Sequence, residues 1–474
     1  MTLKTNDLPV REKTAVGDAA AAAGETKEQV VFGRPLLKEF LLDPAYRNLN
    51  QGSFGTLPRA IQSAQRTYQD RAESRPDQFI RYEYPRLLDE SRRAAESLLR
   101  APPDTVVFVP NATVAANTIL KNLAWNDDGK DEIVYFSTIY GGCGKTVDYV
   151  VDYAGKGLVS AREVGIEYPI EDEEVVRRFR AAVDAAKEEG KRPVVAIFDT
   201  VSSMPGVRFP FEAMTDVCKE LGILSLVDGA QGAGLIDLNL TELDPDFFFT
   251  NLHKWLHVPR GCAAFYVPLR NQGLIKSSLA TSHGYVSPSD RVRTNPMPTW
   301  GKTRFVTEFE FVGTVDNSPY LAVKDAIKWR EGIGGEERIR EWQTNLAREG
   351  GNRVAEILGT EVLDNKTRTL TECGMVNVAL PMVVVDDDGE AGWSTEETLR
   401  VPRGKAKQVH DWMLETLVGE YHTFIALLVH QDRWWARLSA QVYLDMDDFE
   451  WAGKTLLEVV KRAESHEVMT GKGA

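Results

Sequence analysis

Short runs of consecutive apolar residues alternate with longer segments of helical period between about Thr105 and Pro268. The runs are TVVFV (105–109), EIVYFS (132–137), PVVAIFDT (193–200), ILSLVDGA (223–230), DFFFTN (246–251) and CAAFYVP (262–268). Because hydrophobicity that is continuous rather than alternating indicates burial on both faces, these runs predict a mostly parallel sheet covered by helices. The pattern therefore predicts an α/β core.

The pattern of apolar positions changes after Gly313. Two segments of helical period, near 318–332 and 335–358, lead into a region where apolar runs mix with helical segments near 405–418 and 446–463. The apolar runs of this region are MVNVALP, TFIALLV and WARLSAQVYL. This mixture predicts a smaller α+β domain at the C-terminal end.

These changes divide the chain into four expected parts. They are a disordered tail over 1–31, an N-terminal segment over 32–100, a large domain over 101–315 and a small C-terminal domain over 316–474. The N-terminal segment has helical period and is expected to pack on the small domain or on a partner subunit. The stretch VVVDDDGEAGWSTEETLRVPRGKA is expected to be a surface insertion, because its acidic, glycine and proline residues leave little to bury.

Charge and cysteine usage narrow the classes of function. With 70 acidic and 56 basic side chains the net charge is −14, which disfavours nucleic acid or an anionic membrane as the main partner. The four cysteines form no C-x-x-C pair, so the sequence indicates neither a zinc site nor a disulfide framework. There is no signal-like segment and no apolar stretch long enough to cross a bilayer. We therefore expect a cytoplasmic protein.

An anion site is predicted at VPNATVAANTIL, where a strand ends at Pro110 and a helix begins near Asn111. The free N–H groups and positive dipole end of a helix attract anions, and the Asn111 and Thr113 side chains would add donors. Taken alone, Asn-Ala-Thr is more often a helix cap. An ATP-binding loop at YGGCGKT is excluded, since Ile139 stands where the G-x-x-x-x-G-K-[ST] pattern requires glycine.

Two further candidates follow neighbouring apolar runs. Asp228 in LVDGAQGAG ends a buried strand, where open α/β sheets bind ligands, and a carboxylate there needs a cation or strong hydrogen bonds. Lys254 in FFFTNLHKW follows the next strand, so both side chains can project into one crevice. Taken singly, a strand-end turn for Asp228 and a solvated side chain for Lys254 are simpler alternatives.

Together, the acid, the lysine and the anion site match the needs of one cofactor. Pyridoxal 5'-phosphate requires an amine for a Schiff base, an acid beside its ring nitrogen and an anion site for its phosphate. Desolvation would lower the pKa of Lys254, so that its amine can act as nucleophile and base. The joint pattern therefore predicts a pyridoxal phosphate enzyme.

The sequence resembles the fold-type I, class V aminotransferase family, in the subgroup of isopenicillin N epimerase-like proteins and fungal ergothioneine-pathway C–S lyases. The resemblance extends from about Phe32 to Val460 and is strongest toward hercynylcysteine sulfoxide lyases and lyase-like proteins of fungal alkaloid clusters. Its motifs are LNQGSFGTLP, FVPNATVAANT, TIYGGCGKT, SSMPG, VDGAQG, HKW, PRGCAAFYVP, TSHGY, EFVGTVDNSP and RLSAQVYL. It implies a fold-type I architecture with pyridoxal phosphate bound in the large domain.

The resemblance implies roles for residues around the cofactor ring. Lys254 would form the Schiff base, Asp228 would pair with the ring nitrogen and Gln231 would reach the ring hydroxyl. Tyr140 would stack on the ring, and Arg437 would grip the substrate carboxylate. Ordinary core packing for Tyr140 and a surface ion pair for Arg437 are the alternative interpretations.

The resemblance also implies how the phosphate is held. Ala112, Thr113 and His253 would bind it within one subunit. Gly313 and Thr314 match a motif that reaches the phosphate of the neighbouring subunit, which implies a homodimer with its active sites at the subunit interface. A turn residue for Thr314 and a satisfied strand-end histidine for His253 are the alternatives.

One position departs from the family pattern. Where relatives read LNHGSFG, this chain reads LNQGSFG, which places Gln51 where a histidine is expected near the substrate, followed by Ser53. Glutamine can form hydrogen bonds but cannot titrate near neutrality as histidine does. The substitution leaves open a change of substrate or of reaction.

The resemblance implies a C–S lyase that acts by β-elimination on a cysteine-derived S-conjugate or sulfoxide, similar to hercynylcysteine sulfoxide. The alternative is an enzyme of secondary metabolism that forms a C–C bond or ring, or epimerises an amino acid, through the same α-carbanion. A third possibility, a cofactor-free binding protein, is disfavoured by the intact set of Lys254, Asp228, Thr113 and Arg437.

Overall fold

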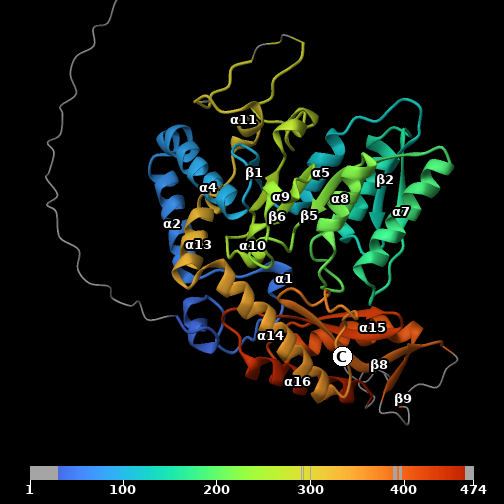
Figure 1. The fold of residues 1–474 in the computed structure, drawn as a ribbon. Helices are drawn as coiled ribbons and strands as arrows, with labels where there is room; N and C mark the ends of the chain where they lie inside the picture. The colour runs from blue at the N-terminus through green and yellow to red at the C-terminus, as the bar shows by residue number, and fades with distance from the viewer. Residues whose placement is uncertain are drawn as a thin grey trace, which may run out of the picture.

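The computed structural model describes residues 30–289, 291, 293–298, 300–387, 392–393 and 398–464. The predicted disordered tail therefore lies almost wholly outside the described residues, as does part of the predicted surface insertion. The described chain forms two sheets, one of seven strands and one of five, which lie in different halves of the molecule (Figure 1). No helix within these residues is long and apolar enough to cross a membrane.

The larger sheet has the strand order β1-β7-β6-β5-β4-β2-β3. Its strands are β1 (Val106–Val109), β2 (Asp131–Phe136), β3 (Val159–Val164), β4 (Arg192–Asp199), β5 (Leu224–Asp228), β6 (Phe247–Asn251) and β7 (Ala263–Tyr266). All neighbouring strands are parallel except β7, which runs antiparallel to β1 and β6. The mostly parallel sheet is thus confirmed, and only the edge strand β3 was not expected from a continuous apolar run.

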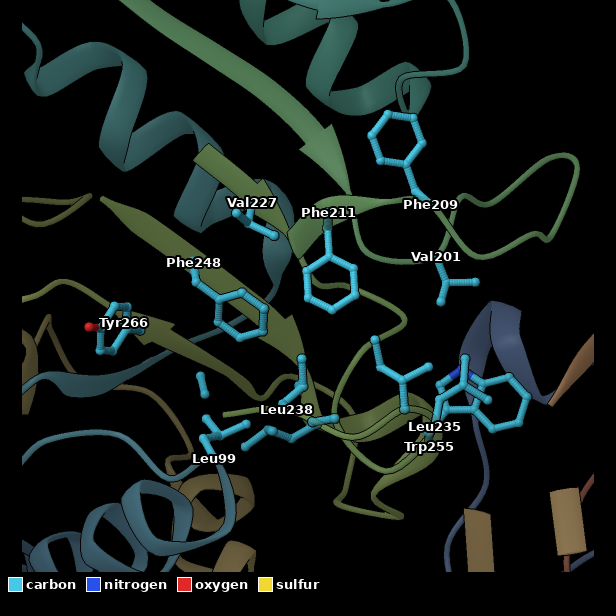
Figure 2. Close-up of a cluster of buried hydrophobic side chains, with 14 of the residues drawn as sticks. Leu99, Val201, Phe209, Phe211, Val227, Leu235, Leu238, Phe248, Trp255 and Tyr266 are labelled. Atoms are coloured by element: carbon cyan, nitrogen blue, oxygen red, sulfur yellow. The ribbon is translucent and has the colours of Figure 1, made fainter. Parts of the chain in front are cut away.

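Successive residues of the larger sheet enter two different cores, as expected for a sheet covered on both faces. Val227 and Phe248 belong to the core that Figure 2 shows, whereas Leu226 and Phe249 belong to the core on the opposite face. The first core includes residues of α7 (Asp172–Glu188) and α8 (Phe211–Leu221), and the second includes residues of α5 (Ala112–Asn122) and α6 (Gly141–Tyr149). The predicted α/β layers are therefore present.

The smaller sheet has the strand order β11-β12-β8-β10-β9 and lies beside three long helices (Figure 1). Its strands are β8 (Met375–Val385), β9 (Gly392–Trp393), β10 (Leu399–Pro402), β11 (Ala426–His430) and β12 (Arg433–Ser439). The helices are α14 (Gly335–Leu358), α15 (Arg403–Gly419) and α16 (Met446–Glu464). This is the predicted α+β part of the chain, and the long helices begin and end within a few residues of the expected positions.

The N-terminal segment bridges the two halves. Its helices are α1 (Gln51–Phe54), α2 (Arg59–Ser74), α3 (Pro76–Gln78) and α4 (Tyr84–Leu98). Helices α2 and α4 pack on α12 (Ser318–Leu321) and α13 (Val323–Gly332), while α1 contacts α10 (Leu252–Trp255). The short helix α9 (Leu240–Leu243) connects β5 to β6. Helix α1 is thereby held against the turn that carries Lys254.

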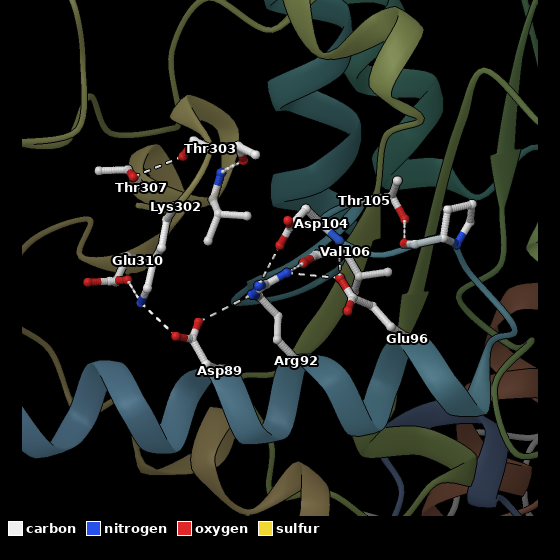
Figure 3. A network of polar contacts seen from close by, with 12 residues as sticks. Asp89, Arg92, Glu96, Asp104, Thr105, Val106, Lys302, Thr303, Thr307 and Glu310 are labelled. Carbon is white, nitrogen blue, oxygen red and sulfur yellow. Dashed lines mark hydrogen bonds and ion pairs between the residues drawn. The ribbon is translucent and has the colours of Figure 1, made fainter. Parts of the chain in front are cut away.

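A buried ionic network fixes α4 in place (Figure 3). Arg92 pairs with Glu96 at 2.9 Å and with Asp104 at 3.0 Å. Lys302, just before α11 (Arg304–Glu310), lies 3.0 Å from Asp89 and also pairs with the carboxylate of Glu310. The network ties the N-terminal segment to the 302–310 segment, which leads toward the loop containing Gly313 and Thr314.

Candidate active site

The carboxyl ends of the parallel strands open onto a cavity of about 300 Å³. Asp228 is the last residue of β5, and Lys254 lies on α10 directly after the neighbouring strand β6. The predicted residues that line the cavity are Ser53, Ala112, Thr113, Tyr140, Asp228, Gln231, His253 and Lys254. The structure thus brings eight of the twelve candidates together at one site.

The amine of Lys254 is held in a desolvated position. Burial lowers its pKa to about 8, and the nearby Arg437 acts in the same direction, while the carboxylate of Asp228 opposes the shift. A larger fraction of the amine is therefore neutral near pH 7 than for a solvated lysine. A neutral amine is the form that attacks a carbonyl carbon and accepts a proton.

The carboxylate of Asp228 is buried and held by two donors. Its Oδ1 accepts a hydrogen bond from the backbone N–H of Ala230 at 2.8 Å, and its Oδ2 accepts one from the Cys143 thiol at 3.4 Å. Burial raises the pKa of Asp228, whereas these two donors and Lys254 favour its charged form. The fixed carboxylate is suited to pairing with a protonated ring nitrogen.

The expected phosphate end of the cavity is built at the start of α5. The Asn111 side-chain oxygen accepts from the Val114 backbone N–H at 3.0 Å, so this residue acts as the helix cap that the sequence left open. The backbone N–H of Ala112 donates to the side-chain oxygen of Asn251 at 2.9 Å. Thr113 is exposed and lines the cavity, which makes it the available donor of this helix start.

His253 also lines the cavity, and its imidazole ring is neutral near pH 7. Its Nδ1 is 3.1 Å from the carbonyl oxygen of Cys262, and burial lowers its pKa to about 4. With Nδ1 donating to that carbonyl, Nε2 is the acceptor of the neutral ring. An anion bound at Nε2 would have to raise the pKa of His253, because only the protonated ring donates from both nitrogens.

Tyr140 precedes α6 and stands at the wall of the cavity. Its side chain is 49% exposed, which excludes the alternative of ordinary core packing. The ring lies against Gly142, where an added Cβ would approach Tyr140 to 2.9 Å. The ring is thus free to cover a flat ligand in the cavity.

Arg437 comes from β12 of the smaller sheet and is only 2% exposed, which excludes a surface ion pair. Its Nη1 donates to the Ser203 carbonyl at 2.6 Å, and its Nη2 donates to Asn50 Oδ1 at 2.6 Å and to Ser53 Oγ at 2.9 Å. Its Nε has no partner among the described residues, and burial lowers the pKa of Arg437 to about 10. A buried guanidinium held by neutral groups can pair with a carboxylate, but Arg437 itself is not among the residues that line the cavity.

Gln51 does not line the cavity. Its side chain is fully buried, donates to the Lys254 carbonyl at 2.6 Å and accepts from Tyr443 at 2.8 Å and from Asn48 at 3.2 Å. Gln51 therefore holds the backbone of Lys254 from behind the site. Gln231 lines the cavity, but it donates to the Gly52 carbonyl and accepts from the Trp255 indole, both at 2.7 Å.

Gly313 and Thr314 lie apart from this site within one chain, in the segment between α11 and α12. Thr314 lines a different cavity, of about 500 Å³, together with residues of α2. Gly313 has a φ of +111°, a conformation that favours glycine. The neighbouring Val315 is 69% exposed, so this segment presents an apolar side chain at the surface.

Asp199 is a cavity residue that the sequence reasoning missed. It is the last residue of β4, lies in register with Asp228 and lines the same cavity. The signal was present, because an acid follows the apolar residues of PVVAIFDT just as Asp228 follows those of ILSLVDGA. Ser203 and Asn251 also line the cavity and had not been singled out.

Comparison with known proteins places this chain in a family. The family model for class-V aminotransferases matches residues 167–391. An L-cysteine desulfhydrase-like protein of Epichloe uncinata is 35% identical over 462 residues, covering 93% of this chain and 98% of the relative. The hercynylcysteine sulfoxide lyase of Schizosaccharomyces pombe is 30% identical over 433 residues, covering 90% of this chain and 98% of the lyase.

More distant matches agree in fold. The isopenicillin N epimerase of Amycolatopsis lactamdurans is 30% identical over 306 residues, covering 65% of this chain and 74% of the epimerase. The cystine C–S lyase C-DES, solved in complex with its product cysteine persulfide, superposes with a TM-score of 0.66 at 19% identity, over 90% of this chain and 99% of that one. The chain therefore belongs to the class V aminotransferase family of pyridoxal phosphate-dependent enzymes and is related to its carbon–sulfur lyases.

Proposed function

We propose that this enzyme is a carbon–sulfur lyase that removes the β-sulfur group from a cysteine-derived S-conjugate or sulfoxide of the hercynylcysteine sulfoxide type. The observation that carries the proposal is that Lys254 and Asp228 line one cavity, while the buried Arg437, whose Nε has no partner among the described residues, is near enough to lower the pKa of Lys254. The similarity to a desulfhydrase-like protein and to a sulfoxide lyase over nearly the whole chain supports the same reaction class.

The residues of the chain fit the cofactor. When bound, pyridoxal phosphate supplies a carbonyl that joins an amine and a ring that accepts the electrons released at the α-carbon. Asp228 would hold the ring nitrogen, Tyr140 would cover the ring, and Thr113 with His253 would hold the phosphate. The buried acid with two donors, the half-exposed ring and the helix start support these roles.

Two side chains would act on the substrate. Arg437 would bind the α-carboxylate through its charge and its unpaired Nε, with Ser53 beside it. Lys254, whose amine has a pKa lowered to about 8 and is therefore partly neutral near pH 8, would take the α-proton. The β-carbon–sulfur bond then breaks with its electron pair leaving on sulfur, as a sulfenic acid for a sulfoxide substrate. One water molecule is consumed, and pyruvate and ammonia are the remaining products.

The same α-proton removal could serve an epimerase or a C–C bond-forming enzyme. In the sequence, the replacement of the family histidine by Gln51 left this alternative open. Gln51 is held by the Lys254 carbonyl and by Tyr443 rather than facing the cavity, so the replacement supports a structural role as well as a change of reaction. The experiment below separates the two outcomes.

The test is a substrate panel on the purified, cofactor-loaded enzyme. Hercynylcysteine sulfoxide, cysteine and S-alkyl cysteines would be incubated in deuterated buffer, with all products identified by mass spectrometry and Lys254→Ala as the blank. Stoichiometric pyruvate that depends on Lys254 supports the lyase. Exchange of the α-hydrogen for deuterium without pyruvate formation would instead indicate an epimerase or a C–C bond-forming enzyme.

We also propose that the enzyme works as a homodimer in the cytoplasm, with Gly313 and Thr314 serving the partner's phosphate site. The segment containing Gly313 and Thr314 lies outside the candidate active site of its own chain and exposes Val315 at the surface, which supports a contact with a second copy. All four cysteines are free and buried, which agrees with a reducing compartment. The molar mass in solution, measured by light scattering, tests the dimer.

A further inference from the structure

Asp199 is a second acid in the cavity beside Asp228. Their strands β4 and β5 are parallel neighbours, and the two residues are partners in register, so both side chains leave the same face of the sheet. Neighbouring strands lie about 4.8 Å apart, which places the two carboxyl groups side by side. Asp199 is 8% exposed and lines the cavity that holds Lys254.

The two acids differ in their partners. Asp228 accepts hydrogen bonds from the backbone of Ala230 and from Cys143. The Asp199 side chain makes no hydrogen bond or ion pair with any residue in the described part of the chain. A polar side chain that is more than nine-tenths buried, unpartnered and facing a cavity indicates a partner supplied by a ligand.

The charges around Asp199 decide its protonation. The groups that act on it are Asp228 on β5 and Lys254 on α10, and it in turn acts on Cys143 on α6 and on Tyr168. Burial raises the pKa of Asp199 well above its usual value, Asp228 raises it further, and Lys254 opposes both. Since the donors favour charge on Asp228, Asp199 is the member of the pair that keeps a proton.

The sheet order places Asp199 relative to the cofactor. Helix α5, with the phosphate site at its start, follows β1, which lies beyond β6 and β7 on one side of β5. Strand β4 lies on the other side of β5. In pyridoxal phosphate, the phosphate arm and the ring hydroxyl flank the reactive carbon on opposite sides. A ring held at its nitrogen by Asp228 and at its phosphate near Thr113 therefore turns its hydroxyl edge toward Asp199.

Gln231, which the family resemblance assigns to the ring hydroxyl, already uses its side-chain oxygen and one of its two amide N–H groups. Its amide donates to Gly52 and its oxygen accepts from Trp255. We propose that Asp199 is a neutral carboxylic acid that donates a hydrogen bond to the hydroxyl edge of the bound pyridoxal phosphate, and so is a catalytic residue in contact with the cofactor. This inference rests on the binding mode in the proposed function, but not on the identity of the substrate.

The test is a pH titration of the visible absorption band of the cofactor-loaded protein, without substrate. A donor to the ring oxygen reduces its negative charge and lowers the proton affinity of the nitrogen joined to Lys254. Asp199→Ala should therefore raise the midpoint by about 1 pH unit, the size expected for one hydrogen bond to a charged group. Asp199→Asn keeps an N–H donor and should leave the midpoint within roughly 0.3 pH unit of the wild type.

Two results would overturn the proposal. If Asp199 is a charged carboxylate, both variants remove a negative charge, and both should lower the midpoint equally. If Asp199 does not touch the cofactor, neither variant should shift it. Asp216→Asn, which removes an exposed carboxylate on α8, is the control for charge alone and should leave the midpoint unchanged. Because no substrate is present, failure of the lyase assay leaves this titration interpretable.

Discussion

Burial sets the chemistry of Lys254 at the scale of a single residue. Its pKa of about 8, lowered by burial from 10.5, means that the neutral amine accumulates as pH rises through 8. The rate at which cofactor-free protein takes up pyridoxal phosphate should therefore rise with pH to a midpoint at about 8. The growth of visible absorbance measures this rate, and Lys254→Ala should form no such band. A midpoint near 10.5 would show a solvated lysine.

Arg437 is the residue whose removal should separate substrate binding from cofactor binding. Arg437→Ala deletes the proposed carboxylate partner and should raise KM for the active substrate by roughly 100-fold. Arg437→Lys keeps the charge but loses the fork that reaches Asn50 and Ser53, so an intermediate KM is expected. Steady-state kinetics and a cofactor titration measure both quantities. Equal losses of cofactor and substrate affinity would argue for a purely structural arginine.

The positions of single site residues could be predicted from the sequence where the residue directly follows a buried strand. Asp228 and Lys254 follow continuous apolar runs, so their place at the sheet edge could be inferred. Gln51 could not be placed in this way, because its partners Tyr443 and Asn48 come together only in the folded chain. The same holds for the hydrogen bond that the Trp255 indole donates to the Gln231 side-chain oxygen.

At the scale of elements, α1 is pressed against the turn that carries Lys254. A Cβ added at Gly55 would lie 1.8 Å from the His253 carbonyl oxygen, and the φ of Gly55 is +65°. Gly55→Ala should destabilise the protein by more than about 2 kcal/mol and weaken cofactor binding, since backbone must move. Gly157→Ala is the matched control, with a φ of +76° and no atom within 4 Å of the added Cβ.

Denaturant unfolding of both variants measures the difference. The control carries the backbone strain alone, of order 1 kcal/mol, and should bind the cofactor normally. Equal destabilisation of the two variants would mean that the contact between α1 and α10 contributes nothing beyond the strain.

Elements were predictable where burial is uniform. The buried runs became β1, β2 and β4 to β7, and the long helical periods became α14, α15 and α16. The edge strand β3 escaped because its middle residues are partly solvent-facing and its sequence VSAREV is half polar. Strand β1, at the other edge of the sheet, carried the signal because all four of its residues are buried.

At the scale of the whole molecule, the site depends on three parts of the chain. Asp228 and Lys254 come from the larger sheet, Arg437 from the smaller sheet, and Asn50 and Ser53 from the N-terminal segment. Any movement of the smaller sheet relative to the larger one would therefore change the distance between Lys254 and Arg437, the proposed carboxylate partner. Substrate binding at Arg437 is expected to favour the arrangement in which these parts are together.

The proposed dimer adds a fourth part, supplied by the partner. If Thr314 serves the other subunit's phosphate site, Thr314→Asp should abolish activity by placing a carboxylate against the phosphate. Lys254→Ala should be inactive for a different reason, because it lacks the amine that joins the cofactor. Mixing and reassembling the two inactive variants should then restore activity, because one site of each mixed dimer combines an intact Lys254 with an intact Thr314.

Random reassembly gives mixed dimers half of the time, with one intact site of two, so about a quarter of wild-type activity is expected. If Thr314 instead serves its own subunit, every site in the mixture carries one of the two substitutions and no activity returns. The measurement is pyruvate formation, or whichever product the substrate panel identifies, after the variants are unfolded together and refolded. Recovery would locate Thr314 across the interface without a structure of the dimer, and it would also establish that the active unit contains two chains.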